Sequence, residues 1–425
     1  MRSIFKLSIY LVLLFGLAAC GGGDSDDGGD GGGSDNDIDN DGVLDAVDID
    51  DDNDGLIEIA TLEELDWIRN DPSGQTLDDG QGNVMIMGCP DVVCIGYELI
   101  ADLDFDTNDD DAIDADDTFY NDGEGWQPIG TGDEPFAAIF DGNGFSISNL
   151  FIDRPVIDGV EVGLFGAVMG DPSQPVEIRN IVLGGDLMDV TGGTSAGGLV
   201  GFAVGNVTIS NVSVGGNVVG NTGTGGLVGA ALAGVTIIGS NVTGDVTGVL
   251  NTGGLVGFTI DSIISESSAS GNVTGDIIAT GGLVGSAQGA AISDTFATGS
   301  VSGEAGVGGL IGLAAASNVS FSFSANSVNG NMDVEAVGAF VGLSADTTYQ
   351  ANHFASGSNM LMAVGEVDGE NVGIDDITGD TLLNLQAQTA PGQAEGELFF
   401  GWDDAIWDFG DDTELPQLIN VGPSP

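Results

Sequence analysis

The sequence predicts an all-β protein whose body is a right-handed parallel β-helix, that is, a β-solenoid. The first observation is an apolar motif framed by glycines that returns along the chain. The steps from Gly197 to Gly225, Gly253 and Gly281 are each 28 residues. A fixed period of this size is typical of chains that stack one supersecondary unit on the next. The copies are "GLFG" at Gly163, "GGLVG" at Gly197, Gly225, Gly253 and Gly281, "GGLIG" at Gly308 and "GAFVG" at Gly338.

The second observation is the composition of each repeat. Short β-prone runs such as "VTISNVSV" (207–214) alternate with Gly, Asn, Thr and Ser, and helix formers are almost absent. Such runs describe one coil of a parallel β-helix. We expect the neighbouring glycines to lie at corners where φ is positive or where backbones approach closely. The motif leucines should form an inward column: Leu199, Leu227, Leu255, Leu283 and Leu310.

The first residues read as an export signal. Arg2 and Lys6 form a positive start, residues 9–15 an apolar stretch, and "LAAC" ends at Cys20. This pattern resembles the bacterial lipobox, in which the cysteine is acylated and becomes the new N-terminus. The apolar run is too short for a transmembrane helix. The resemblance implies a signal peptide over 1–19, a lipid anchor at Cys20, a flexible tether over 20–34, and a surface-exposed place on the outer membrane.

The charge balance is strongly acidic. The chain has 67 Asp and Glu against 5 Lys and Arg, a formal net charge of −62. Residues 180–425 contain neither Lys nor Arg. Such a surface repels nucleic acid and attracts cations, so nucleic acid is not expected as a partner. A hydrophobic content of 42% argues against a wholly disordered polyanion.

An acidic segment over 35–58 carries two loops with calcium-ligand spacing. In "DIDNDGVLDAVD" (37–48), oxygen side chains stand at positions 1, 3, 5, 9 and 12, and Gly42 stands at position 6. This spacing brings alternate carboxylates around one hard cation. The alternative is a solvated acidic linker that binds counterions diffusely. The ligands expected in this first loop are Asp37, Asp39, Asp41, Asp45 and Asp48.

Two further loops are less complete. The second places Thr61 at position 12, so it should be weaker or share ligands with the first loop. The third has Asp111 where the turn glycine is expected. Without flanking helices, the first two loops resemble the calcium repeats of thrombospondin type 3. The expected ligands are Asp50, Asp52, Asp54 and Glu58 in the second loop, and Asp106, Asn108, Asp110, Asp114 and Asp117 in the third.

The remaining cysteines, Cys89 and Cys94, enclose the short segment "CPDVVC" and predict a disulfide in an oxidising compartment. A metal site is less favoured, because two thiolates without a nearby histidine supply too few ligands.

Residues 59–162 are interpreted as an N-terminal cap with the first coils. Thr61 followed by Glu64 predicts a capped amphipathic helix that carries Leu62, Leu65 and Ile68. Alternating apolar residues in "YELIADLDF" and "FAAIFDGNGFSISNLFI" indicate strands, and "DGNG" at Asp141 indicates a hairpin-like turn.

The repeats over 163–345 resemble the GLUG motif of bacterial surface proteins, which is named partly from the IgA-peptidase family. "DNDGLIEIATLEELDWIRND" and "GWQPIG" followed by "PFAAIFDGNGFSISNLFI" look like the segments that precede such repeats. "GWDDAIWDFGDDTELPQL" looks like their C-terminal cap, within 346–425. The resemblance implies architecture, and it implies no particular activity.

Catalytic residues are not expected, and we do not expect an enzyme. His353 is the one histidine of the chain, which excludes a zinc-peptidase motif with two histidines. We expect His353 to be a structural or surface residue after the last coil. The alternative is a β-helix polysaccharide hydrolase that uses paired carboxylates. Its candidates are Asp186 with Asp189, and Asp245 with Asp276 on successive coils.

Five N-x-S/T sites are interpreted as Asn and Thr ladders or turns in stacked coils: Asn206, Asn211, Asn241, Asn272 and Asn318. Together, these patterns favour a lipid-anchored, calcium-binding surface solenoid that adheres to or recognises an extracellular glycan or protein.

Overall fold

The computed structural model describes residues 49–86, 88–89, 93–155, 161–174, 176–331, 336–356, 361–394, 397–411 and 413–422. The predicted export signal, Cys20, the tether and the first calcium loop therefore lie outside the described residues. Within these ranges, no helix is long and apolar enough to cross a membrane.

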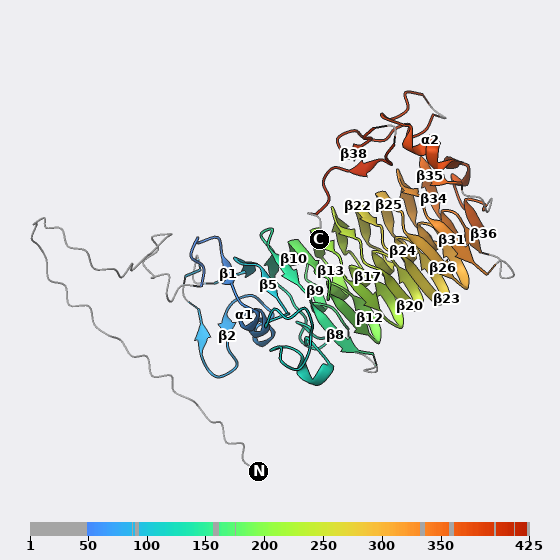
Figure 1. The fold of residues 1–425 in the computed structure, drawn as a ribbon. Coiled ribbons are helices and arrows are strands. Elements are labelled where there is room, and N and C mark those ends of the chain that lie inside the picture. Colours follow the sequence, from blue (N-terminus) through green and yellow to red (C-terminus); the bar gives the residue numbers. More distant parts are fainter. Residues whose placement is uncertain are drawn as a thin grey trace, which may run out of the picture.

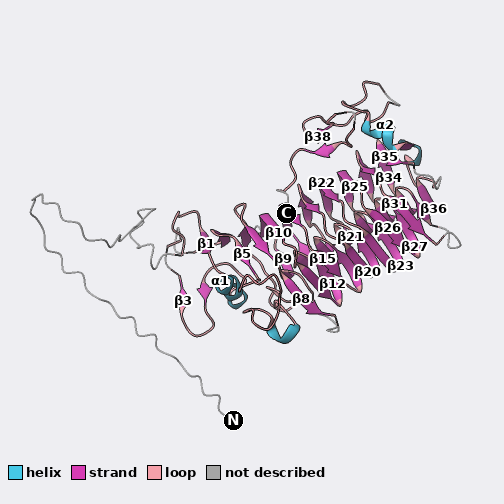
Figure 2. Cartoon of the chain, in the orientation of Figure 1, coloured by secondary structure: helices cyan, strands magenta, loops and turns pink. Residues whose placement is uncertain are grey.

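The chain winds through three parallel sheets in turn, so the predicted parallel β-solenoid is confirmed (Figure 1). Figure 2 shows that strands build the whole body and that helices lie only towards its two ends. The first sheet runs through β1 (Leu56–Ile59), β4 (Gly96–Leu99), β6 (Ile139–Asp141), β10 (Val176–Gly184), β14 (Val207–Val214), β18 (Thr236–Ile238), β22 (Ile263–Ala269), β25 (Ala291–Ala297), β30 (Phe323–Ser324), β35 (Asn352–Ala355) and β37 (Ile377–Asp380), and it also includes β5 (Leu103–Asp104), β7 (Ser146–Ser148), β19 (Asn241–Val242), β29 (Asn318–Ser320) and β34 (Thr348–Gln350).

The other two parallel sheets form the remaining sides of each coil. The second contains β8 (Phe151–Arg154), β11 (Asp189–Gly192), β12 (Thr194–Gly197), β15 (Asn217–Val219), β16 (Thr222–Gly225), β20 (Val246–Gly253), β23 (Val273–Gly281), β26 (Ser300–Gly303), β27 (Ala305–Gly308), β31 (Ser327–Gly330) and β32 (Val337–Gly338). The third contains β9 (Phe165–Gly170), β13 (Val200–Gly205), β17 (Val228–Leu232), β21 (Val256–Ile260), β24 (Val284–Gln288), β28 (Ile311–Ala315), β33 (Val341–Ala345) and β36 (Val364–Asp368).

Smaller elements decorate the two ends. They are α1 (Leu62–Trp67), the 3₁₀ turns η1 (Ile68–Asn70), η3 (Asn121–Gly123) and η4 (Ile374–Asp376), α2 (Leu382–Gln386), and the antiparallel pairs β2 (Leu77–Asp78) with β3 (Val84–Met85) and β38 (Trp407–Asp408) with β39 (Gln417–Leu418).

The interior column predicted from the repeat is confirmed. All five motif leucines are 0% exposed and belong to one apolar core. Backbone bonds link them from coil to coil; for example, the Leu227 N–H donates to the Leu255 carbonyl at 3.0 Å. Each coil therefore buries the apolar face of the next, which is the source of stability in a solenoid.

The motif glycines are explained by close backbone approach. A Cβ on Gly253 would lie 2.1 Å from the Val256 carbonyl oxygen, and one on Gly257 would lie 2.4 Å from the Thr224 nitrogen of the preceding coil. No side chain fits at these distances. Glycine therefore recurs at these positions because the backbones of neighbouring segments approach too closely for a Cβ atom. The left-handed backbone falls elsewhere, for example at Asn251 (φ 53°) and Ala279 (φ 61°) on successive coils.

The N-terminal region forms the helix and the first coils as predicted. Thr61 caps α1, accepting from the Glu64 N–H at 3.2 Å, and Leu65 and Ile68 are fully buried. The hairpin expected at "DGNG" is wrong. Both β6 and β7 pair in parallel with β10, so the turn is an excursion within one coil.

The C-terminal region continues the solenoid and then turns back. Strands β34 to β37 extend the coils past residue 345 to Asp380. The tail, residues 382–422, then runs back beside β22 and β25 (Figure 1), where the Gly422 N–H donates to the Gly239 carbonyl at 2.8 Å. The tail covers the first sheet with an aromatic cluster separate from the interior core: Phe296, Phe323, Leu385, Phe399, Trp402, Trp407, Phe409 and Leu418. The predicted cap thus packs along the side of the solenoid.

Candidate metal centre

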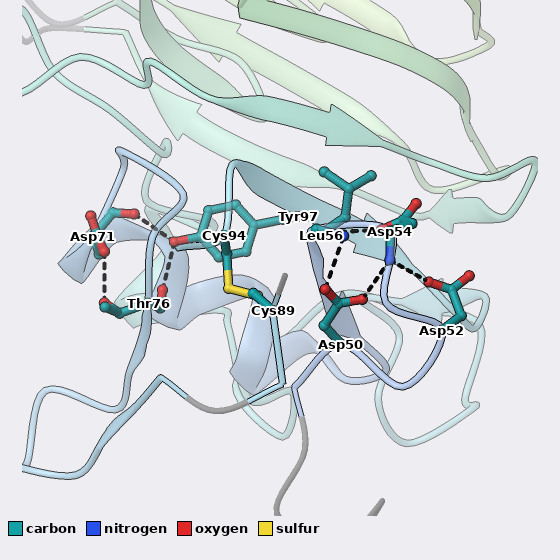
Figure 3. The surroundings of a disulfide bond; sticks show 10 residues. Asp50, Asp52, Asp54, Leu56, Asp71, Thr76, Cys89, Cys94 and Tyr97 are labelled. Atoms are coloured by element: carbon teal, nitrogen blue, oxygen red, sulfur yellow. Dashed lines mark hydrogen bonds between the residues drawn. A yellow bond between two sulfur atoms is a disulfide. The ribbon is translucent and has the colours of Figure 1, made fainter. Parts of the chain in front are cut away.

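The second predicted calcium loop forms a tight carboxylate-lined turn before β1. Asp50 is fully buried, and its carboxylate accepts from the N–H groups of Asp54 at 3.1 Å and Gly55 at 2.9 Å. Positive φ at Asn53 (61°) and Gly55 (93°) curls the backbone around this carboxylate. Oxygens of Asp50, Asp52 and Asp54 lie within 4.8 Å of one another. Figure 3 shows the three carboxylates at the entry to β1.

Two glutamates lie in register beside this loop. Glu58 of β1 pairs with Glu98 of β4, and Glu98 pairs with Asp141 of β6. Burial raises the pKa of Glu98 to about 7, and the charges of Asp54 and Asp52 add to this effect. Burial likewise raises the pKa of Glu58 to about 7, with a further contribution from the charge of Asp51. Carboxylates on successive rungs therefore concentrate negative charge beside the loop.

One positively charged side chain, Arg179, lies at the end of this row of carboxylates, next to Asp141. Arg179 of β10 lies opposite Asp141 in the register, and its Nε donates to Asp141 at 2.6 Å. Arg179 also pairs with Glu177. The Glu98 carboxylate accepts from the neutral Asn143 amide at 3.2 Å. The direct ion pairs of this arginine are therefore with Asp141 and Glu177, and its charge also acts on Asp54 from a greater distance.

The site has the composition that a hard cation requires. Calcium takes six to eight oxygen ligands, mostly from carboxylates and carbonyls. Asp50, Asp52 and Asp54 can supply three, and Glu58 and Glu98 stand nearby. Thr61, which the loop spacing puts at position 12, instead caps α1. Sequence reasoning missed Glu98, since its only signal is an acidic residue inside an otherwise apolar strand.

The structure supports the third loop less well. Its backbone turns as predicted, with Asp111 taking the glycine-like conformation at φ 63°. The buried carboxylate of Asp106 accepts from the Asp110 and Asp111 N–H groups, and that of Asp117 accepts from the Thr107 and Asp114 N–H groups. In the part of the chain that the structure describes, however, three acidic side chains converge only at Asp50, Asp52 and Asp54. Asp106, Asp110, Asp114 and Asp117 are not gathered in this way.

The predicted disulfide is confirmed and lies close to the candidate site (Figure 3). Cys89 and Cys94 are bonded, with their Cα atoms 5.2 Å apart. The next residue, Ile95, donates its N–H to the Gly55 carbonyl at 2.9 Å. The disulfide therefore fixes the segment that leads into β4 and that bonds to the predicted calcium loop at Gly55.

The carboxylate pair expected on successive coils is wrong for Asp245 and Asp276. The register pairs Val246 with Val273, which places Asn272 next to Asp245. Asp245 Oδ1 accepts from the Asn272 N–H at 2.7 Å. Asp186 lies in the turn before β11, where Asp189 pairs with Asn217.

The predicted polar ladders are present between coils at Asn211, Asn241 and Asn272, and a further one is present at Asn217. Asn217 Oδ1 accepts from the Asp245 N–H at 3.3 Å, and Asn272 Oδ1 accepts from the Ser300 N–H at 3.1 Å. Asn211 donates to Asn180 Oδ1 at 2.7 Å, and Asn241 donates to Ser213 Oγ at 2.8 Å. These side chains join neighbouring coils, as expected for stacked strands.

His353 is a structural residue, and it lies within a coil rather than after the last one. It belongs to β35, between β30 and β37, and is 4% exposed. Its Nδ1 lies 2.6 Å from Thr378 Oγ1, and its Nε2 accepts from the Phe399 N–H at 3.1 Å. Nδ1 therefore joins β35 to β37, and Nε2 holds the tail to these last coils.

Comparison with known proteins gives partial matches. No family model matches the chain. A stretch of 122 residues, 28% of the chain, is 38% identical to the "Putative Gly-rich membrane protein" of Evansella cellulosilytica. A stretch of 127 residues, 29% of the chain, is 33% identical to "Halomucin" of Haloquadratum walsbyi. The matches span 12% and 1% of the lengths of these relatives.

Among solved structures, a "putative immunoglobulin A1 protease" from Bacteroides ovatus is similar, with a TM-score of 0.45 and 18% identity, over 86% of this chain and 92% of that chain. A likeness at this level says nothing about activity.

Proposed function

We propose that this chain is a non-catalytic, calcium-binding surface solenoid that recognises an extracellular glycan or protein. The observation that carries the calcium part is the convergence of Asp50, Asp52 and Asp54 at the entry to the first coil. Support for a surface location comes from the two partial relatives, one named a membrane protein and the other halomucin. The lipobox and GLUG resemblances of the sequence agree with this proposal.

Calcium would act here as a structural ion. Asp50, Asp52, Asp54 and Glu58 would supply carboxylate oxygens, and Glu98 would supply the carboxylate that position 12 lacks. Bound calcium would neutralise side chains that otherwise repel one another across β1 and β4. The ion would therefore stiffen the junction between the acidic segment and the first coil.

Calcium binding to the full chain tests this part. Extracellular sites of this type bind at about 10⁻⁴ to 10⁻³ M. At about 10 mM calcium and a dissociation constant of about 10⁻³ M, binding raises the free energy of unfolding by about 1.4 kcal/mol. Equilibrium dialysis should show that Asp50→Asn removes about one bound ion per chain. Glu98→Gln should lower the affinity for that ion about tenfold, because the substitution removes one charged ligand.

The matched control is Asp133→Asn, which removes one charge from an exposed position. It should bind as the unmodified chain does. Equal binding by Asp50→Asn and Asp133→Asn would contradict the site. Limited proteolysis gives a second readout, since chelation should expose cleavage sites between Asp35 and Asp117 and leave the repeats intact. Identical fragments with and without chelator would count against it.

The recognition role requires a separate test. A strain of the source organism that lacks this chain should attach less well to its natural surfaces, and the restored chain should recover attachment. Unchanged attachment to every surface tried would contradict the role and leave the calcium site unaffected.

A further inference from the structure

A cavity of about 720 Å³ opens between the last coils and the returning tail. This volume is within the range of small-molecule sites. Its walls come from the two coils that contain Phe321 and His353, from the segment around β37, and from the tail. The cavity lies at the far end of the solenoid from the candidate calcium loop, so it is a separate site.

His353 lines the cavity and packs against aromatic residues of the tail. The ring packs edge to face on Phe399, with centroids 4.8 Å apart, and lies 5.6 Å from the Trp402 ring. Trp402 Nε1 donates to the Ala351 carbonyl at 3.0 Å. Burial lowers the pKa of His353 to about 4, against the opposing charge of Asp380. At neutral pH the His353 ring is therefore uncharged.

The walls combine carboxylates with aromatic surface. Phe321 and Phe400 both line the space, and Phe400 is 41% exposed although it is a large apolar side chain. One wall carboxylate, Asp380, is oriented by the Thr381 N–H at 2.7 Å and the Asn384 amide at 2.6 Å. Residues 180–425 contain no Lys or Arg, so this part of the chain supplies no Lys or Arg to neutralise the carboxylates. The acidic lining residues are Asp375, Asp376, Asp380 and Glu397.

We propose that this cavity binds an organic cation, an alkylammonium or guanidinium group on an apolar stem. The carboxylates would attract the charged group, and Phe321 and Phe400 would contact the stem and the cation face. A bare metal ion would gain nothing from the two aromatic rings. The same chemistry is found in a free polyamine and in an arginine or lysine side chain of a protein ligand, and the experiment separates these sources.

The test measures binding to the full chain by isothermal titration calorimetry at pH 7, with calcium present throughout. The probes are spermidine, a short arginine-containing peptide, a neutral analogue of the same size, and a neutral oligosaccharide. Spermidine should bind with one strong site per chain. Tighter binding of the peptide would identify a protein ligand, and tighter binding of spermidine would identify a free amine.

Two variants locate the site. Phe400→Ala should weaken spermidine binding about tenfold, since it removes the exposed ring. Asp375→Asn combined with Asp376→Asn should weaken it by a similar or larger factor. The control, Glu366→Gln combined with Asp404→Asn, makes the same change of charge at exposed positions that do not line the cavity. It should bind within about twofold of the unmodified chain.

Three results would overturn the proposal. Equal weakening by the control would show diffuse counterion binding to an acidic surface. Equal binding of the neutral analogue would show that the cavity does not recognise the positive charge of the ligand. Preferred binding or hydrolysis of the oligosaccharide would assign the carboxylates and rings to a sugar site. Near-ultraviolet circular dichroism of each variant confirms that the tail remains packed.

Discussion

The repeat body and the two ends of this molecule are stabilised in different ways. Between β13 and β28, each coil repeats the same buried leucine and the same glycines, so these packing contacts recur one coil later. At the ends, single contacts dominate: a disulfide and a carboxylate row at the start, and an aromatic tail anchored on His353 at the finish. The repeated packing stabilises the solenoid body. The candidate metal site and the tail cavity lie at the two ends, where the sequence no longer repeats.

The largest effect is expected from a motif glycine in the body. Gly253→Ala would place a Cβ 2.1 Å from a backbone oxygen that cannot move without disturbing two coils. We expect a loss of about 3 kcal/mol or more in the free energy of unfolding, measured by urea denaturation. Gly132→Ala in the N-terminal region is the control, because nothing lies within 4 Å of its Cβ position. Comparable losses in both variants would remove the distinction between body and ends.

The second prediction concerns pH at the C-terminal end. His353 has a pKa of about 4 when folded, against about 6.5 in an unfolded chain. Between these values the unfolded chain binds the additional proton, so stability falls as pH drops from 6.5 towards 4, by about 3 kcal/mol in total. His353→Gln lacks this titration. Its stability difference from the unmodified chain, measured by urea unfolding, should therefore shrink by that amount. A difference that stays constant with pH would show that His353 does not carry this dependence.

A third prediction refines the interior of the body. Thr224, Thr252 and Thr280 stack in register, and their buried hydroxyls make no hydrogen bond. The next coils carry Val307 and Val337 at this place. Thr252→Val should therefore raise the free energy of unfolding by about 1 kcal/mol. Thr295→Val is the control, because Thr295 Oγ1 lies 3.0 Å from Ser322 Oγ and its loss should lower stability by about 1 kcal/mol. The same sign for both variants would contradict the explanation.

The smallest effect is expected at a corner of the body. Ala316 is exposed and holds φ 50°, where the equivalent position one coil earlier is Gly289 at φ 64°. Ala316→Gly should raise stability by about 0.5 kcal/mol, because it relieves the left-handed strain and loses little contact. The neighbouring Ala315→Gly, within β28, should lower it by a similar amount. Thermal unfolding of the pair would measure this difference, and a loss in both would indicate that the corner is not strained.

The sequence by itself determined the parallel coil, the inward leucines, the capped helix and the disulfide. Each of these follows from short-range spacing or from a strict period, which a chain displays residue by residue. The sequence also indicated the cluster of Asp50, Asp52 and Asp54, because these three carboxylates lie within five residues of one another.

Only the tertiary structure decided which distant residues meet. Glu98 lies opposite Glu58 through the register of β1 and β4, which are separated by a stretch that does not repeat. "DGNG" looks like a hairpin locally, yet both flanking strands pair with β10. The tail and its cavity depend on where Phe296 and Phe323 lie after all coils have stacked. These contacts escape the sequence because register and packing between non-repeating segments are set by the whole fold.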